Sequence, residues 1–428
     1  MRFVLAIPIL LCGFVVGQEL PKGEGWTVPP PVKQSQANGV KHSPADIGRQ
    51  FAVIEPVDGT FSRAVSDDGR FIVSTDYEKN RVYVQSSADG GVVANISPPP
   101  KYKITILSEC CLSPGGDFVA AGVEKGEGQY ENPAVVVWDV ATGRVDGTYV
   151  GVNKAYGFTD CFDAIAVTKD HVIATVTARN GASLEEKSFV RVWDRASSKL
   201  VHSFAGHRRG VKALAVYPAS GLVATGGEDR IVIVWEAKTG REVAVLDEHE
   251  SEIEAVAFSP DGTKILSGGF ECSVRLWDIA SRKRLAKWQL GLHDAQEEAK
   301  MRALEAQRDL EFKVSLLAGN PKRTESLLIT WPFSRVRSVA FSPDGGRAVV
   351  GLLAIAPQTL THATNPVLID LKSGEVIPLP AAFQAEPISA VKAVFVRDGN
   401  AIMFNKEIRE RVRGEDKART VLSVTGIP

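Results

Sequence analysis

Histidines, cysteines and carboxylates are the residues of this sequence best able to do chemistry, and their spacing matches no enzyme motif. His249-Glu250 begins like a zinc-protease motif, but Ile253 stands where the second histidine ligand would have to be. The sequence also lacks a Gly-x-Ser-x-Gly nucleophile turn, a glycine-rich phosphate loop and a Cys-x-x-Cys pair. We therefore expect no catalytic residue, no metal and no cofactor.

The cysteines do not form a metal or disulfide pattern. Cys110 and Cys111 are adjacent in a predicted strand, where neighbouring side chains point to opposite faces and cannot hold one metal together. Apart from Cys12, the remaining cysteines are Cys161 and Cys272, and four cysteines in a chain of this length are no disulfide framework. The sequence predicts buried free thiols.

Composition and charge indicate a folded protein without general affinity for nucleic acid. Of the 428 residues, 44% are hydrophobic and 24% charged, which supplies enough apolar material for a core. Lys and Arg number 50 against 51 Asp and Glu, so the chain has no long-range attraction for phosphates. The basic stretch from Arg409 to Arg419 also carries Glu410, Glu415 and Asp416, which favours a solvated loop.

The first 49 residues read as export and tether segments. Met1-Arg2 precedes the apolar run from Phe3 to Val16, which is too short to span a bilayer comfortably. We expect a signal peptide at 1–17, export to the periplasm or medium, and no stable membrane span after cleavage. An uncleaved anchor is the alternative, but Pro8 interrupts the run. Residues 18–49 have no periodicity and read as a Pro-rich flexible tether.

From Phe51 onward the sequence repeats one unit seven times. Each unit begins with an apolar strand that runs into a tight turn, where Pro presets φ and Gly supplies a positive φ. A hairpin is therefore encoded locally. The turns follow the strands at 258–262, 341–345, 112–116, 65–69 and 396–399, with two degenerate copies at 216–221 and 167–170.

A second marker follows four of the hairpins, namely a strand that ends in tryptophan and an acid. Trp193, Trp235 and Trp277 are spaced 42 residues apart, and Trp138 precedes them by a longer interval. At this period the sequence resembles the WD-repeat β-propeller family, and the resemblance covers most of residues 51–428. It implies an all-β fold of four-stranded blades.

In that family a histidine, an acid, a serine or threonine and the tryptophan indole form a hydrogen-bond chain that locks a blade. The best copy matches with His207, Thr225, Asp229 and Trp235. The next copy has His249, Ser267 and Trp277, with Glu271 where the family has aspartate. The resemblance therefore implies structural roles for both histidines, since a buried hydrogen-bonded histidine is more often structural than catalytic.

Seven hairpins imply a seven-bladed propeller spanning 50–428. The last copy supplies only three strands, and the segment Gln50–Ile54 would provide the missing outer strand and close the last blade. Residues from about 291 to 333 do not fit the repeat. Their apolar positions advance by three or four residues, which predicts a helical insertion between blades five and six that packs on the propeller or under a partner.

The resemblance places the binding surface at the channel mouth, where loops lead into the innermost strands. Aligning the seven first strands gives a mixed ring of candidate partner-binding residues: Phe61, Ser108, Asp163, Lys212, Glu254, Arg337 and Lys392. Lys212 stands between Asp163 and Glu254, so salt bridging is a sufficient structural explanation for these charges.

Two functions remain open at this point. The favoured one is a non-catalytic, monomeric, exported scaffold that binds a protein partner at the channel mouth. The alternative is a metal-dependent propeller hydrolase of the lactonase-like kind, which needs several carboxylates on the axis and has only Asp163 and Glu254 as candidates.

Overall fold

A computed structural model gives the fold of the chain, which divides into Met1–Pro30 and Pro31–Pro428. Every described element belongs to the second unit. The structure describes residues 50–54, 61–66, 69–104, 109–125, 134–150, 158–180, 186–290, 335–356, 361–363, 366–377, 379, 393–396, 399–412 and 415–427. The predicted signal peptide, tether and helical insertion lie outside these residues.

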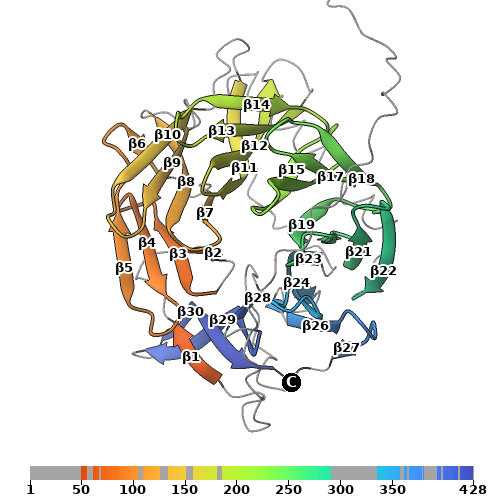
Figure 1. The fold of residues 1–428 in the computed structure, drawn as a ribbon. Coiled ribbons are helices and arrows are strands. Elements are labelled where there is room, and N and C mark those ends of the chain that lie inside the picture. Colours follow the sequence, from red (N-terminus) through yellow and green to blue (C-terminus); the bar gives the residue numbers. More distant parts are fainter. Residues whose placement is uncertain are drawn as a thin grey trace, which may run out of the picture. The chain divides into compact units, whose positions relative to one another are not determined.

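The described elements are antiparallel strands, which confirms the all-β class, and they form seven sheets (Figure 1). Sheet 1 contains β2 (Phe61–Val65), β3 (Phe71–Asp76), β4 (Arg81–Ser86) and β5 (Val92–Ile96). Sheet 2 contains β6 (Tyr102–Lys103), β7 (Cys110–Leu112), β8 (Phe118–Lys125), β9 (Ala134–Asp139) and β10 (Val145–Val150). Sheet 3 contains β11 (Phe158–Val167), β12 (His171–Asn180), β13 (Glu186–Asp194) and β14 (Leu200–Phe204). Sheet 4 contains β15 (Val211–Tyr217), β16 (Leu222–Gly227), β17 (Val232–Glu236) and β18 (Glu242–Leu246).

The remaining three sheets follow in chain order, except that the last one takes its outer strand from the start of the chain. Sheet 5 contains β19 (Ile253–Phe258), β20 (Lys264–Gly269), β21 (Ser273–Asp278) and β22 (Lys283–Gln289). Sheet 6 contains β23 (Arg335–Phe341), β24 (Arg347–Ala356), β25 (Thr361–Ala363), β26 (Pro366–Asp370) and β27 (Val376–Ile377). Sheet 7 contains β28 (Ala393–Val396), β29 (Ala401–Val412), β30 (Glu415–Gly426) and β1 (Gln50–Ile54).

Hydrophobic clusters join each sheet to the next one. The second and third strands of the sheets are nearly continuous runs of buried residues, because both of their faces are covered by neighbouring sheets. One cluster packs sheet 4 against sheet 5 around Trp277, and another packs sheet 3 against sheet 4 around Trp235. Ile72 of sheet 1 packs with Val396 and Met403 of sheet 7, so the first and last sheets also share a core.

Sheet 7 contains strands from both ends of the described chain. Ala52, Val53 and Ile54 of β1 pair antiparallel with Val424, Ser423 and Leu422 of β30. This is the pairing expected from the missing outer strand of the last repeat. The backbone groups of β30 are thereby paired on both sides along this stretch, which removes an edge that would invite aggregation.

The expected loop from Arg409 to Arg419 was wrong, because the chain there continues as strand. β29 and β30 stay paired from Ala401↔Gly426 out to Val412↔Glu415. In this register Glu410 lies opposite Lys417 and Arg411 lies opposite Asp416.

The acid after each tryptophan fixes the turn between the third and fourth strands of a sheet. Asp139 Oδ1 accepts hydrogen bonds from the backbone N–H and the hydroxyl of Thr142, both at 2.7 Å. Asp278 does the same with Ser281, at 2.8 and 2.5 Å. These bonds hold the pKa of both aspartates below its usual value.

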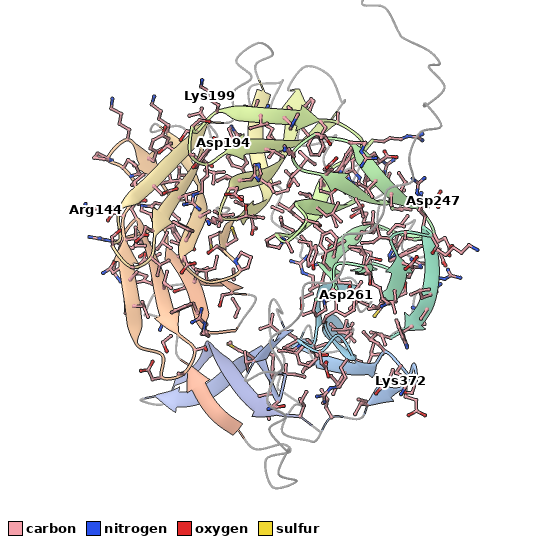
Figure 2. All side chains as sticks on the ribbon, in the orientation of Figure 1. Arg144, Asp194, Lys199, Asp247, Asp261 and Lys372 are labelled. Carbon is pink, nitrogen blue, oxygen red and sulfur yellow. The ribbon has the colours of Figure 1, made fainter. Side chains whose placement is uncertain are left out.

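Because the strands of each sheet alternate in direction, the connections lie at two ends. At one end, which we call the loop face, lie the segments that lead into the first strands, such as 205–210 and 247–252, and the turns between second and third strands. The other end, the turn face, carries the remaining turns, including those of Arg144 and Lys199. Figure 2 labels both residues.

Candidate functional site

In sheet 4, the four residues that the resemblance singled out form one hydrogen-bond chain. The indole N–H of Trp235 donates to Thr225 Oγ1 at 2.9 Å, and Thr225 Oγ1 lies 2.8 Å from His207 Nε2. His207 Nδ1 lies 2.9 Å from Asp229 Oδ1, and Asp229 Oδ2 accepts the backbone N–H of Arg208 at 2.8 Å. The chain therefore ties the core of the sheet to its loop face.

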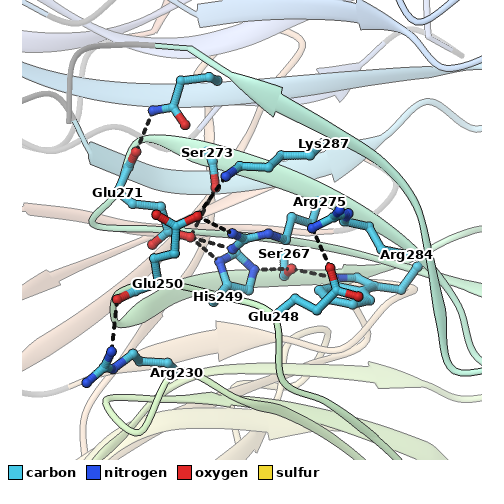
Figure 3. Close-up of polar contacts among 12 residues, drawn as sticks. Arg230, Glu248, His249, Glu250, Ser267, Glu271, Ser273, Arg275, Arg284 and Lys287 are labelled. Atoms are coloured by element: carbon cyan, nitrogen blue, oxygen red, sulfur yellow. Dashed lines mark hydrogen bonds and ion pairs between the residues drawn. The ribbon is translucent and has the colours of Figure 1, made fainter. Parts of the chain in front are cut away.

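In sheet 5, the corresponding chain includes an additional buried cation (Figure 3). Trp277 donates to Ser267 Oγ at 2.8 Å, Ser267 Oγ lies 2.6 Å from His249 Nε2, and His249 Nδ1 contacts Glu271 Oε1. Arg275 donates to the same carboxylate oxygen at 2.5 Å. The side chains of His249, Glu271 and Arg275 are fully or almost fully buried.

Glu271 fits the position of the family aspartate because its longer side chain serves three donors. Besides His249 and Arg275, the hydroxyl of Ser273 donates to Glu271 Oε1 at 3.0 Å. The sequence pattern did not identify Arg275, whose counterpart in sheet 4 is Ile233. The sequence does carry one sign of it, because Arg275 stands between apolar residues in a strand that the pattern predicts to be buried. A cation at such a position requires a buried partner.

The pKa values in sheet 5 indicate a charged Glu271 and a neutral His249. Burial alone raises the pKa of Glu271, but the hydrogen bond from His249 and the charge of Arg275 outweigh it and lower the pKa to about 2. Burial also lowers the pKa of His249, and this outweighs the opposite effect of Glu271. In sheet 4, burial raises the pKa of Asp229, but the hydrogen bond from His207 lowers it. The pKa of Asp229 lies below its usual value as a result.

On the loop face, four of the candidate partner-binding residues share a backbone feature. Asp163, Lys212, Glu254 and Arg337 are each the extra residue at a β-bulge, where the register of the first strand shifts against the second. A bulge turns a side chain out of the regular alternation of the strand. The four charged residues are therefore displayed in the same way at the start of sheets 3 to 6.

The ion pairs among these residues differ in part from the expected ones. Lys212 Nζ lies 3.5 Å from Asp163 and 3.1 Å from Glu228. Glu254, however, pairs with Arg337 and, at 3.3 Å, with Arg335. The charges thus link sheet 3 to sheet 4 and sheet 5 to sheet 6.

Phe61 does not share the bulged position of these four residues. The bulge of β2 falls at Arg63, between Ser62 and Ala64, so Phe61 lies opposite Thr75 in regular pairing. Sequence alignment on the turn could not locate this shift, because the bulge lies two residues nearer the turn than in the other sheets. Ser108 and Lys392 lie outside the described residues.

Two residues of this face were missed by the sequence alignment. Glu228 follows β16 and Arg335 begins β23, so neither stands at the aligned position. Arg335 also lies over the ring of Phe270, with its guanidinium carbon 4.8 Å from the ring centroid.

Within the described ranges, no group of three or more His, Cys, Asp and Glu side chains is placed to hold a metal ion. Cys110 and Cys272 are buried free thiols and Cys111 is a partly buried one. A helix long and apolar enough to cross a membrane was not found in the part of the chain that the structure describes.

Comparison with protein families identifies the repeats. The model of the WD domain, G-beta repeat, matches residues 198–236 and 240–278, which include the two hydrogen-bond chains. Residues 198–278 of the chain therefore contain two WD repeats. In the comparison with curated proteins, no sequence matched.

Among solved structures, the WD-repeat chain is similar to a propeller chain in the crystal structure of the mitotic checkpoint complex. The two are 14% identical with a TM-score of 0.57, and the match covers 91% of this chain and 98% of the other. At this identity the likeness concerns the fold alone.

Proposed function

We propose that this WD-repeat protein is a closed seven-bladed propeller that acts as an exported, non-catalytic scaffold and binds a protein partner on its loop face. Seven sheets with a shared core between the first and the last support the closed form. The observation that carries the function is the row of bulged charged residues, Asp163, Lys212, Glu254 and Arg337, on one face. Charged residues displayed on a rigid frame give a surface that selects a partner by electrostatic complementarity.

The ion pairs favour the scaffold over the hydrolase. A metal-dependent hydrolase would use Asp163 and Glu254 as ligands, but Asp163 lies beside Lys212, and Glu254 beside Arg335 and Arg337. Cations at these positions oppose the binding of a divalent metal. Metal analysis of the purified protein should accordingly find no stoichiometric ion.

Affinity capture tests the scaffold proposal. A Lys212→Ala/Arg337→Ala variant should lose most of the partner captured by the unchanged protein from the extracytoplasmic fraction. The matched control, Arg144→Ala/Lys199→Ala, removes two exposed cations from the turn face and should capture the partner normally. Equal capture by both variants would place the binding surface elsewhere.

Export is supported by the sequence of residues 1–17 and has its own test. Amino-terminal sequencing of the protein recovered outside the cytoplasm should begin at Gln18. Recovery of a chain beginning at Met1 from the membrane fraction would instead support the uncleaved anchor.

A further inference from the structure

Three exposed arginines lie together on the loop face of sheet 4. Arg208 and Arg209 belong to the segment that leads into β15, and Arg230 belongs to the turn between β16 and β17. The carboxylate of Asp229 holds the two segments together, since it accepts the backbone N–H of Arg208 at 2.8 Å and also binds His207. We call Arg208, Arg209 and Arg230 the arginine cluster.

Among the described residues, no ion pair joins a guanidinium group of the arginine cluster to a carboxylate. Arg230 donates at 3.3 Å to the backbone carbonyl of Glu250, which carries no net charge (Figure 3). The side chain of Glu250 pairs with Lys287 at 2.9 Å instead, and Glu228 pairs with Lys212 at 3.1 Å. The carboxylates of Glu250 and Glu228 are thus engaged by lysines, and that of Asp229 by His207 and the backbone N–H of Arg208.

The backbone of Arg230 is held in an unfavourable conformation. Its φ is 72°, in the left-handed region where glycine or asparagine costs less than a long side chain. The strained position nevertheless carries an exposed arginine. The corresponding turn residues of sheets 1 and 5, Asn80 and Cys272, also have positive φ, at 55° and 53°, so the conformation belongs to the turn of the repeat.

We propose that the arginine cluster binds an acidic segment of a protein partner. This inference rests on the proposed function and specifies the chemistry of the partner. Guanidinium groups bind carboxylates through two parallel hydrogen bonds.

The surroundings favour an acidic peptide over single-stranded nucleic acid. Binding of a single strand relies on aromatic rings on which bases stack and on a basic groove along the backbone. The neighbouring ring of Phe270 is covered by Arg335, and the whole chain has a formal charge of −1.

Fluorescence anisotropy with a labelled octaglutamate peptide tests the inference on the full chain. The Arg208→Glu/Arg209→Glu variant should raise the Kd about tenfold or more, because two attractive charges become repulsive. The control Arg144→Glu/Lys199→Glu reverses two exposed charges on the turn face and should stay within about twofold. Arg208→Ala/Arg209→Ala should give an intermediate Kd, since it removes the attraction without adding repulsion.

Three results would overturn the inference: no binding of octaglutamate, equal weakening by the two charge-reversed variants, or tighter binding of an oligo-dT of the same length. Partner capture that survives Arg208→Glu/Arg209→Glu would also overturn it and leave the proposed scaffold function intact. If Lys212→Ala/Arg337→Ala loses the partner and Arg208→Glu/Arg209→Glu keeps it, the scaffold function stands and the arginine cluster is not the binding site.

Discussion

At the scale of single residues, the buried pair of Glu271 and Arg275 distinguishes sheet 5 from sheet 4. Glu271→Gln would remove the buried carboxylate that binds Arg275 at 2.5 Å and leave the guanidinium only the partly exposed Glu250 at 3.6 Å. Removing one partner of a buried ion pair typically costs about 3–5 kcal/mol of unfolding free energy. Glu248→Gln, which breaks the exposed pair with Arg284, should cost less than about 1 kcal/mol. Urea denaturation would measure both.

The double variant Glu271→Gln/Arg275→Met separates charge from packing. It removes the buried cation and should recover much of the stability lost in Glu271→Gln, since well-packed apolar residues often replace a buried pair at little cost. A double variant as unstable as Glu271→Gln would show that the carboxylate acts mainly through His249.

The same cluster predicts that acid destabilises the protein. The pKa of Glu271 is about 2 in the folded chain against 4.5 when unperturbed, so the unfolded state binds more protons between these values and stability falls as pH falls. His249 acts in the same direction below 6.5, because its folded pKa is lowered. Urea melts at stepped pH should show a smaller loss in Glu271→Gln/Arg275→Met than in the unchanged protein, and parallel curves would contradict the assignment.

Sequence reasoning found the histidine-to-tryptophan chains because each member stands at a fixed place in a repeat of about 42 residues. It did not find Arg275, Glu228 or Arg335. Glu228 pairs with a residue of another strand and Arg335 with a residue of another sheet, so no local pattern marks these two. Arg275 binds Glu271 four residues away, but it replaces an apolar residue of the neighbouring repeat and so lies outside the repeat pattern. Residues fixed by the repeat were predictable, whereas residues outside its pattern were not.

At the scale of elements, the glycines of the tight turns differ in what surrounds them. Gly143 and Gly262 both have positive φ, at 66° and 69°. An added Cβ would meet nothing within 4 Å at Gly143, but it would lie 2.2 Å from the ring of Tyr217 at Gly262. Gly143→Ala should cost about 1–2 kcal/mol for the backbone alone, and Gly262→Ala about 2–4 kcal/mol in total. Equal thermal shifts for the two variants would contradict the close packing of sheets 4 and 5.

Strands and turns were predictable from sequence because hydrophobic runs and Pro-Asp-Gly turns are local signals. The pairing register of the strands was not predictable in this way. The bulge of β2 at Arg63 and the continued pairing of β29 with β30 depend on contacts across strands, which a single sequence does not display.

At the scale of the whole molecule, β1 joins the start of the described chain to its last sheet. Deleting residues 18–45 should leave the protein folded, whereas deleting residues 18–57 removes β1, exposes the edge of β30 and should cause aggregation. Light scattering and thermal melting of both truncations check this. Equal solubility and melting temperature would show that β1 contributes nothing to closure.

Hydrogen–deuterium exchange of the protein alone and with its captured partner locates the binding surface. The proposal predicts slower exchange on binding in peptides that cover 205–213 and 247–256 on the loop face, and unchanged exchange in the outer strands β5 and β10. Protection of β5 and β10, with the loop-face peptides unaffected, would contradict the proposed binding face.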